Sequence, residues 1–502
     1  MDRTTGHATA ITGAYDKEEK KWRKPVRLRL AIAALLIAAS AVPNLGFEIN
    51  TFGFYWTFYR LVVVILALIT LIVYRGEVKI TARREGLLWM GFLLAWLVYG
   101  AILLVASPYS DMNRGTLELF SVLCGLLSFF ILSRLSLTDR EIEALLRVVF
   151  FILLGLILLG FYEIISADHL STSMFNDPEN RVAYRVDPHS ASGIMYNIND
   201  FSALLTLMCP AVIGRFRMKL RRGYFDPGWL MVLAVVVINR VNDANTCNIA
   251  IIVGILLYAI LPLMGNRRTM GRAMLFFAII AVAGILFFML KEGEDGGIVA
   301  RVFGLVKDTT EGQGSLHSRI LIYRDAFAAT WKTGLLGLGP AGFPVYYTMY
   351  PSDSNFINPH SLVLEILSQY GIIICLGFLL LLGRLIVRMY RIFKGEALLA
   401  AGTVKGSDPV ASSAADEEKV GDESLEKERS CKMKQAALSG MTAADEMAVH
   451  GKRREWGRLG LILVVVYFIV SFASSSYLLN TLHWTLLAVL ALISDIERER
   501  GI

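Results

Sequence analysis

Charged residues are scarce in this chain. Asp, Glu, Lys and Arg make up 19% of its 502 residues, while 55% of the residues are hydrophobic. A soluble protein has about 25% charged and about 45–50% apolar residues, so the shortage of charge excludes a soluble enzyme or a disordered chain. It predicts a membrane protein instead. Because one bilayer crossing needs about 20 apolar residues, the apolar content suffices for at most about a dozen crossings.

Cysteine is rare as well, and its spacing does not match a redox pair or a metal site. The five cysteines form neither a CxxC pair nor a Cys/His metal spacing, which excludes a disulfide scaffold. The chain also lacks a Walker loop, a Rossmann fingerprint, a DxD or HExxH motif and a convincing pair of carboxylates. We therefore expect no metal and no cofactor. The first apolar run has no Ala-x-Ala site after it and is interpreted as a retained membrane span, not a signal peptide.

Twelve apolar runs are candidates for crossing a membrane. They fall near residues 28–46, 55–74, 87–106, 116–133, 146–165, 194–214, 228–239, 247–264, 273–290, 361–383, 459–475 and 477–494. Lys and Arg gather in alternate loops between them, as cytoplasmic loops do. This distribution explains the net charge of +7 without a nucleic-acid partner and places both termini in the cytoplasm.

The fold class that we predict is an all-α polytopic membrane protein with about 12 transmembrane helices. Its segments are a cytoplasmic tail (1–27), helices 1–9 (28–290), an extracytoplasmic loop (291–359), helix 10 (360–383), a cytoplasmic, largely disordered insert (384–458), helices 11–12 (459–494) and a cytoplasmic tail (495–502). The insert is rich in Ala, Ser, Glu and Lys and poor in aromatic residues, a composition that cannot bury a core.

The extracytoplasmic loop has a periodic pattern of its own. Ile320, Tyr323, Phe327 and Trp331 recur every three to four residues, which predicts an amphipathic helix from Ser315 to Lys332 lying on the outer membrane surface. The glycine-rich sequence GLLGLGPAGF follows and predicts a tight turn. A long loop with such order is usually functional.

Of the seven histidines, His360 is the strongest candidate for a functional residue. It follows Asn358-Pro359, precedes Ser361 and begins an apolar run of helical length. A histidine at a helix start near the membrane surface can act as a base, or it can simply anchor the helix at the interface. Position alone does not choose between these two interpretations.

Arginines form the second group of candidates. Arg60, Arg240, Arg319 and Arg324 are all predicted at the outer face, beside or between apolar segments. Such charges are costly near a membrane and tend to be functional. Arginine binds phosphate oxygens bidentately, whereas the alternative is a side chain that only extends to the interface.

The region from Ser318 to Leu376 resembles the signature of the O-antigen ligase/polymerase superfamily. The matching features are Arg319, Trp331, the Gly337-Leu338-Gly339 turn with Phe343, and His360-Ser361 followed by Gly371. The twelve-span layout and the segment 197–210 (NINDFSALLTLMCP) are similar too. Two positions depart from the pattern: Ile374 replaces a small residue or Tyr, and Ala244-Asn245 stands where Ser-Arg is frequent, with Arg240 nearby.

The resemblance implies a GT-C-like, metal-independent, inverting glycosyltransferase of the bacterial cytoplasmic membrane. Its donor would be an undecaprenyl diphosphate-linked glycan and its acceptor a second glycan, with the active site at the outer face. Arg319 and His360 would be catalytic, with Arg60, Arg240, Arg324, Asn358 and Ser361 binding substrate. Expected partners are the lipid bilayer and other membrane proteins of polysaccharide assembly.

Three functions remain open at this point. The incomplete ligase pattern at Ile374 favours a polysaccharide polymerase over a ligase acting on a lipid A-core or protein acceptor. The alternative of another class is a transporter or lipid-linked glycan flippase. Against it, the chain has no convincing internal repeat, and its polar candidates gather at one face instead of the membrane midplane.

Overall fold

The computed structural model describes residues 27–43, 48–51, 54–74, 84–135, 137–177, 186–213, 218–220, 223–262, 314–351, 359–394, 443–473 and 480–499. Helices dominate these ranges. A first helix covers 27–41, and the further helices are α2 (Phe58–Val73), α3 (Arg84–Ala106), α4 (Met112–Arg134), α5 (Asp139–Ser166), η2 (Met174–Asn176), α6 (Ile198–Val212), α7 (Pro227–Val241), α8 (Asn245–Ile260), α11 (Gly314–Lys332), α12 (Gly342–Met349), α13 (Leu362–Lys394), α15 (Ala443–Val470) and α16 (Thr481–Glu499).

The predicted spans coincide with helices, except for the ninth (273–290), which lies outside the described residues. Four helices, α3, α4, α5 and α13, are long and apolar enough to cross a membrane. The apolar helices α2, α6, α7, α8 and the Thr481–Asp495 part of α16 are shorter. These helices define a polytopic membrane protein, while the number of 12 crossings stays a prediction.

Two features differ from the prediction. The structure contains short strands, and two helices extend into the predicted insert. Antiparallel hairpins join β1 (Glu48–Thr51) to β2 (Phe54–Thr57) and β3 (Met218–Leu220) to β4 (Gly223–Phe225). Both hairpins connect consecutive helices. In addition, α13 continues to Lys394 and α15 begins at Ala443, so both ends of the predicted insert 384–458 are helical.

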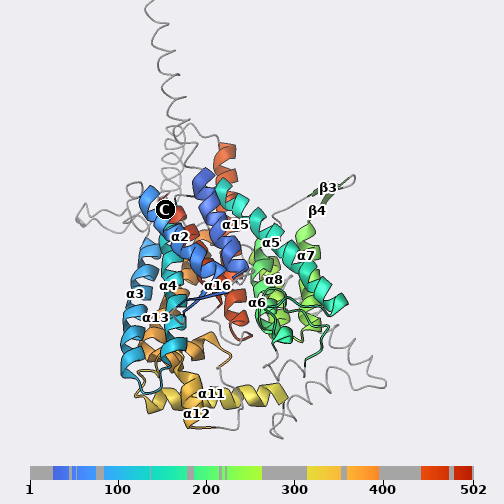
Figure 1. Cartoon of the computed structure of the whole chain (residues 1–502). Coiled ribbons are helices and arrows are strands. Elements are labelled where there is room, and N and C mark those ends of the chain that lie inside the picture. Colours follow the sequence, from blue (N-terminus) through green and yellow to red (C-terminus); the bar gives the residue numbers. More distant parts are fainter. Residues whose placement is uncertain are drawn as a thin grey trace, which may run out of the picture.

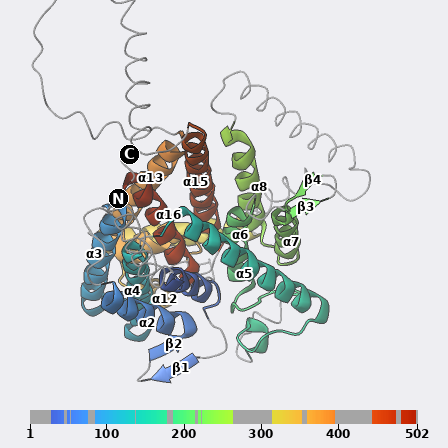
Figure 2. The same cartoon turned by 90° about the horizontal axis from the view of Figure 1, so that it is seen from above.

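The helices form a bundle around α15 and α16. Helix α15 packs against α13 on one side and against α8 and α6 on the other (Figure 2). Helix α16 packs against α4 and α3. Figure 1 shows α11 lying crosswise at one end of this bundle, next to α12. We call this the loop end, defined by residues 107–111, 186–197, 333–351 and 471–473.

A buried ionic network holds the opposite end. Glu85, at the start of α3, accepts two hydrogen bonds of 3.0 Å from Arg384 Nε, one to each carboxylate oxygen. Arg388 Nε lies 2.7 Å from Glu85 Oε1. The Asp495 carboxylate of α16 accepts from the backbone N–H groups of Glu85 and Gly86, both at 2.9 Å. Because all four groups are paired, this cluster fixes α3, α13 and α16 relative to one another.

Helix α11 lies where the amphipathic helix is predicted, but its buried face is a different one. Ile322, Ala326 and Ala329 are buried, whereas Phe327 is 57% and Trp331 77% exposed. The small buried side chains allow α11 to approach α13, against which it packs. The aromatic face therefore points away from the protein, as expected for a helix whose aromatic side chains contact lipid.

Candidate active site

Helix α13 is broken at Gly371, and the glycine-rich turn fills the break. Gly371 has φ 75° and ψ −177°, a backbone conformation that is essentially restricted to glycine. The carbonyls of Ser368 and Gln369 accept from the N–H groups of Leu338 and Gly339, each at 2.8 Å. The turn thus satisfies backbone carbonyls that the interrupted helix leaves unpaired. Two separate parts of the sequence signature, the turn and Gly371, are in direct contact.

The break turns residues 362–370 into a short helix with its own N-terminus at the loop end. His360 and Ser361 stand immediately before it, and His360 has a left-handed φ of 49°. Ser361 is buried, and its Oγ has no hydrogen-bond partner. Within the described residues, no acceptor is found for the N–H groups of Val363 and Leu364. Free amides and a free hydroxyl at a helix N-terminus favour an anion.

Glu118 connects the glycine-rich turn and the short helix to α4 through hydrogen bonds. The buried carboxylate belongs to α4 and accepts from the backbone N–H of Ala341 at 3.0 Å and from the Tyr370 hydroxyl at 2.7 Å. It therefore links α4, the glycine-rich turn and the end of the short helix. Our sequence analysis did not select Glu118. The signal that could have found it is an ionisable residue inside an apolar run.

We expect Glu118→Ala to destabilise the protein and Glu118→Gln to do so much less. Alanine leaves two buried donors without an acceptor, at about 1–3 kcal/mol each, whereas the glutamine carbonyl can still accept one of them. Thermal unfolding of the detergent-solubilised protein measures the difference. Equal melting temperatures for the two variants would show that the hydrogen bonds of Glu118 do not hold the turn.

The segments that carry Arg319 and His360 are both anchored at the end of α15. Arg319 Nη1 donates to the Phe472 carbonyl oxygen at 2.6 Å. The preceding carbonyl, that of Ser471, accepts from the N–H of Leu362 at 3.2 Å, two residues after His360. The two residues predicted to be catalytic are far apart in sequence, and adjacent carbonyls of one turn anchor the segments that carry them.

Arg60 lies in a polar cavity of about 270 Å³ at the loop end, together with Asp200 and Asn480. Arg240 and Arg324 are placed differently. Their side chains are more than half exposed, and each is beside an aspartate: Arg240 lies 3.4 Å from Asp243, and Arg324 lies 3.5 Å from Asp325. The structure does not bring either of these two into contact with His360. Asn358 lies outside the described residues.

Lys332 adds a further positive charge at the loop end. Its Nζ lies 3.1 Å from the ring centroid of Tyr350 and 5.6 Å from that of Tyr346. The hydrogen bond to Tyr350 raises the pKa of Lys332, and the same ammonium group lowers the pKa of Tyr350. Lys332 is therefore a stable cation, which suits a surface that receives an anionic substrate.

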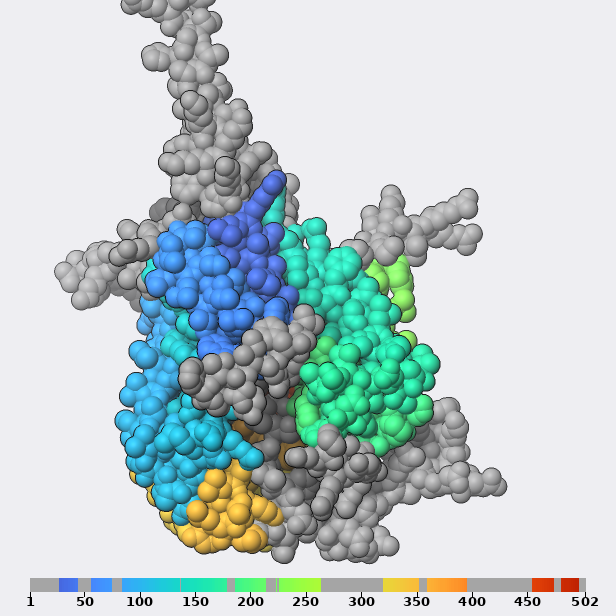
Figure 3. Space-filling model, viewed as in Figure 1, coloured from blue at the N-terminus to red at the C-terminus, as the bar shows by residue number. Residues whose placement is uncertain are grey.

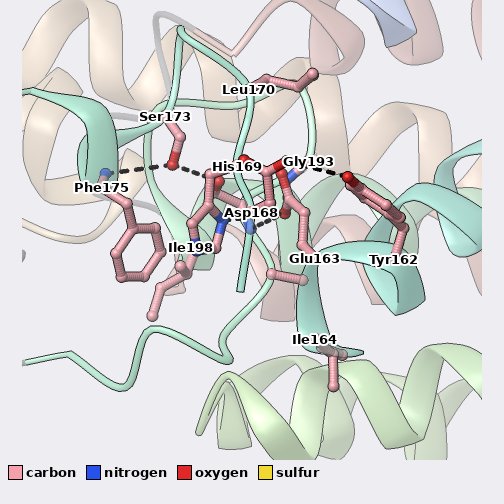
Figure 4. A network of polar contacts seen from close by, with 12 residues as sticks. Tyr162, Glu163, Ile164, Asp168, His169, Leu170, Ser173, Phe175, Gly193 and Ile198 are labelled. Atoms are coloured by element: carbon pink, nitrogen blue, oxygen red, sulfur yellow. Dashed lines mark hydrogen bonds and ion pairs between the residues drawn. The ribbon is translucent and has the colours of Figure 1, made fainter. Parts of the chain in front are cut away.

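Two other histidines at this end have structural partners. Glu163 accepts from the N–H groups of Ser192 and Gly193 at 2.8 and 2.7 Å and lies 3.7 Å from His169 Nδ1 (Figure 4). His169 Nε2 lies 2.8 Å from the Pro188 carbonyl oxygen. His189 Nδ1 lies 2.8 Å from that of Ile164. These contacts hold the loop between α5 and α6, so His169 and His189 have structural roles, unlike the one proposed for His360.

The fold and the site together define a class: a polytopic membrane protein with arginines, a histidine and a polar cavity gathered at one end of its bundle. Residues 229–382 match the protein-family model described as O-antigen ligase. This match includes Arg240, Arg319, His360, Ser361 and Gly371. The predicted resemblance to the O-antigen ligase/polymerase superfamily is confirmed over these residues.

A curated relative extends the similarity beyond that region. The chain is 24% identical over 388 residues to the teichuronic acid biosynthesis protein TuaE of Bacillus subtilis (strain 168), which covers 73% of this chain and 75% of the relative. At the level of the family, the chain is therefore an integral membrane protein of the cell envelope. Both matches support, at the level of the family, a part in surface polysaccharide assembly with a glycosyltransferase-like ligase or polymerase activity.

Proposed function

We propose that this protein is a surface polysaccharide polymerase. It moves a glycan from an undecaprenyl diphosphate donor to an acceptor glycan at the outer face of the bacterial cytoplasmic membrane, with both chain termini in the cytoplasm. The observation that carries this proposal is the anchoring of the Arg319 and His360 segments on the adjacent carbonyls of Ser471 and Phe472. This anchoring supports a site in which His360 is the proton acceptor and Arg319 the phosphate-binding cation.

The reaction joins an acceptor hydroxyl oxygen to the anomeric carbon of the donor. His360 takes the hydroxyl proton as the new bond forms. The bond between the anomeric carbon and the diphosphate oxygen breaks, its electron pair goes to that oxygen, and undecaprenyl diphosphate leaves. Attack opposite the leaving group inverts the anomeric carbon. Other membrane proteins of polysaccharide assembly supply the donor and receive the product.

Positive charge has to balance the departing diphosphate, because its negative charge grows as the anomeric bond breaks. Arg319 uses one N–H of its guanidinium for the Phe472 carbonyl, and an arginine has five N–H donors. Its remaining donors, Ser361 Oγ and the free amides of the short α13 helix form the phosphate site in this proposal. Arg60, Arg240, Arg324 and Asn358 are proposed to bind parts of the substrate away from the reacting atoms, and the reaction needs no metal.

Deletion of the gene, followed by complementation with Arg319→Ala, tests the proposal. We expect long-chain polymer to be lost and lipid-linked single repeat units to accumulate in the outer leaflet, with a rate of polymer formation at least about 100-fold below wild type. Electrophoresis of the polymer and leaflet-selective labelling of the glycolipid measure both quantities.

Each alternative function gives a different result. Accumulation in the cytoplasmic leaflet would contradict the polymerase and support a flippase. Intact lipid-linked polymer that is not passed to a lipid A-core or protein acceptor would indicate a ligase. Arg319→Lys keeps the charge but loses the bidentate geometry, so we expect its activity to lie between those of wild type and Arg319→Ala.

A further inference from the structure

The polar cavity around Arg60 has no role assigned to it beyond the general binding of substrate. It has a volume of about 270 Å³ and is lined by, among others, Arg60, Ser121, Tyr196, Asp200, Asn480 and Thr481. In Figure 3, this face of the molecule is hollowed between the blue and cyan helices α2–α4 and the green region around the start of α6. Another cavity is lined almost entirely by aliphatic side chains, so a polar lining is not shared by all cavities of the described residues.

Asn480 gives the most direct indication of a ligand. Its Oδ1 caps α16 by accepting from the N–H of Leu482 at 3.1 Å. The cap fixes the orientation of the amide group, so the NH₂ group must point elsewhere. The residue is only 8% exposed, and Nδ2 has no hydrogen-bond partner among the residues that the structure describes. A buried donor without an acceptor is costly, and native structures retain few of them. A ligand oxygen would satisfy it.

The charges in the cavity indicate which ligand. Arg60 and Asp200 both line it, so a cation and an anion are present in one wall. The Asp200 carboxylate would repel a diphosphate, and Arg60 would repel a cationic group. A sugar residue fits both, because each hydroxyl can donate to a carboxylate and accept from a guanidinium or an amide.

The sequence positions of the lining residues also support a sugar-binding role. All of its lining residues lie between Pro43 and Asp200 or at Asn480 and Thr481, outside the family match of residues 229–382. Arg319 and His360 lie inside that match. The residues proposed to carry out the reaction therefore lie in the matched region, whereas the cavity is built from other parts of the chain.

We propose that this cavity is a carbohydrate subsite, in which Asn480 Nδ2 donates to a hydroxyl oxygen of one sugar residue and Arg60 and Asp200 contact neighbouring hydroxyls. The subsite rests on the proposed function, since the sugar belongs to the glycan being transferred. It makes Asn480 and Asp200 specificity-determining residues, which the sequence analysis did not select.

Asn480→Ser tests the subsite, because serine also caps helices but lacks the amide donor. The matched control is Asp226→Ser, which changes the N-cap of α7, where Asp226 Oδ1 accepts from the N–H of Gly228 at 2.9 Å. Both proteins are purified at full length in nanodiscs. Their dissociation constants are measured for two probes: undecaprenyl diphosphate carrying the repeat unit of the host polysaccharide, and undecaprenyl diphosphate without sugar.

We expect Asn480→Ser to bind the sugar-bearing lipid about three- to ten-fold more weakly, the effect of one lost hydrogen bond. Its affinity for the sugar-free lipid should be unchanged, and Asp226→Ser should match wild type for both probes. Equal weakening for the two lipids, or no weakening for either, would overturn the subsite. A wild-type protein that prefers the sugar-bearing lipid but makes no polymer would contradict the proposed function alone.

A kinetic experiment distinguishes donor from acceptor sugar as the occupant. Free repeat-unit oligosaccharide without lipid can serve only as an acceptor. A raised KM for this oligosaccharide in Asn480→Ser, at unchanged kcat, places the acceptor sugar in the cavity. An unchanged KM together with weakened glycolipid binding places the donor sugar there.

Discussion

Replacement of His360 by alanine is expected to abolish glycan transfer while the protein remains folded. The imidazole stands directly before the short α13 helix, and the same turn that anchors this helix also binds Arg319. A positioned general base contributes about 10²–10⁴-fold to a rate, so we expect a loss of that size in the rate of transfer by the purified enzyme.

His189→Ala is the matched control for this prediction. His189 also lies at the loop end, but its ring contacts only the Ile164 carbonyl among the described residues, so its loss should change the rate by less than about two-fold. A His360→Ala enzyme that retains wild-type activity would exclude the histidine as a base. Similar melting temperatures for the two variants would establish that an activity loss does not result from unfolding.

Gly371→Ala is expected to disrupt the whole site. A Cβ on Gly371 would lie 2.4 Å from the carbonyl oxygen of Leu335 and 2.5 Å from that of Leu336, and its φ of 75° strains any residue with a side chain. The turn would have to move away, and its hydrogen bonds to α13 would be lost. Strain of about 1–3 kcal/mol and the broken contacts together should reduce the amount of folded protein severalfold and eliminate activity.

Gly383→Ala on the same helix is the control, because a Cβ there meets nothing within 4 Å. Alanine is a better helix former than glycine by about 1 kcal/mol, so this variant should be as stable as wild type or slightly more so. Size-exclusion profiles and thermal unfolding in detergent compare the two. A Gly371→Ala protein as stable as Gly383→Ala would mean that the break in α13 is not required.

The positions of the helices could be predicted because long apolar runs leave few alternatives in a membrane. The same reasoning located His360 at the start of a helix and Arg319 on α11. The break at Gly371 was not predictable, since the run 361–383 has the length and composition of one membrane-spanning helix. Only the docking turn, which lies elsewhere in the sequence, explains why the helix stops there. The hairpin at residues 48–57 was not predicted. Its second strand overlaps the apolar run 55–74, which was interpreted as a helix from its first residue.

The buried face of α11 shows a different limit. The large residues Phe327 and Trp331 define the apolar period in the sequence, yet alanines form the face that packs against protein. In lipid, large apolar side chains do not have to be buried in protein, and small ones permit close helix contacts. The role of Asn480 was equally hidden, because its free amide becomes visible only once the cap of α16 and the cavity are known.

The central claim is that this chain forms glycosidic bonds from a lipid diphosphate donor with Arg319 and His360. Reconstituting the purified protein in liposomes with lipid-linked repeat units, in the presence of a strong chelator, tests it most directly. We predict elongated lipid-linked glycan and one undecaprenyl diphosphate released per new bond, with both products absent for His360→Ala. Transfer of unchanged repeat units across the bilayer, without release of undecaprenyl diphosphate, would contradict the claim.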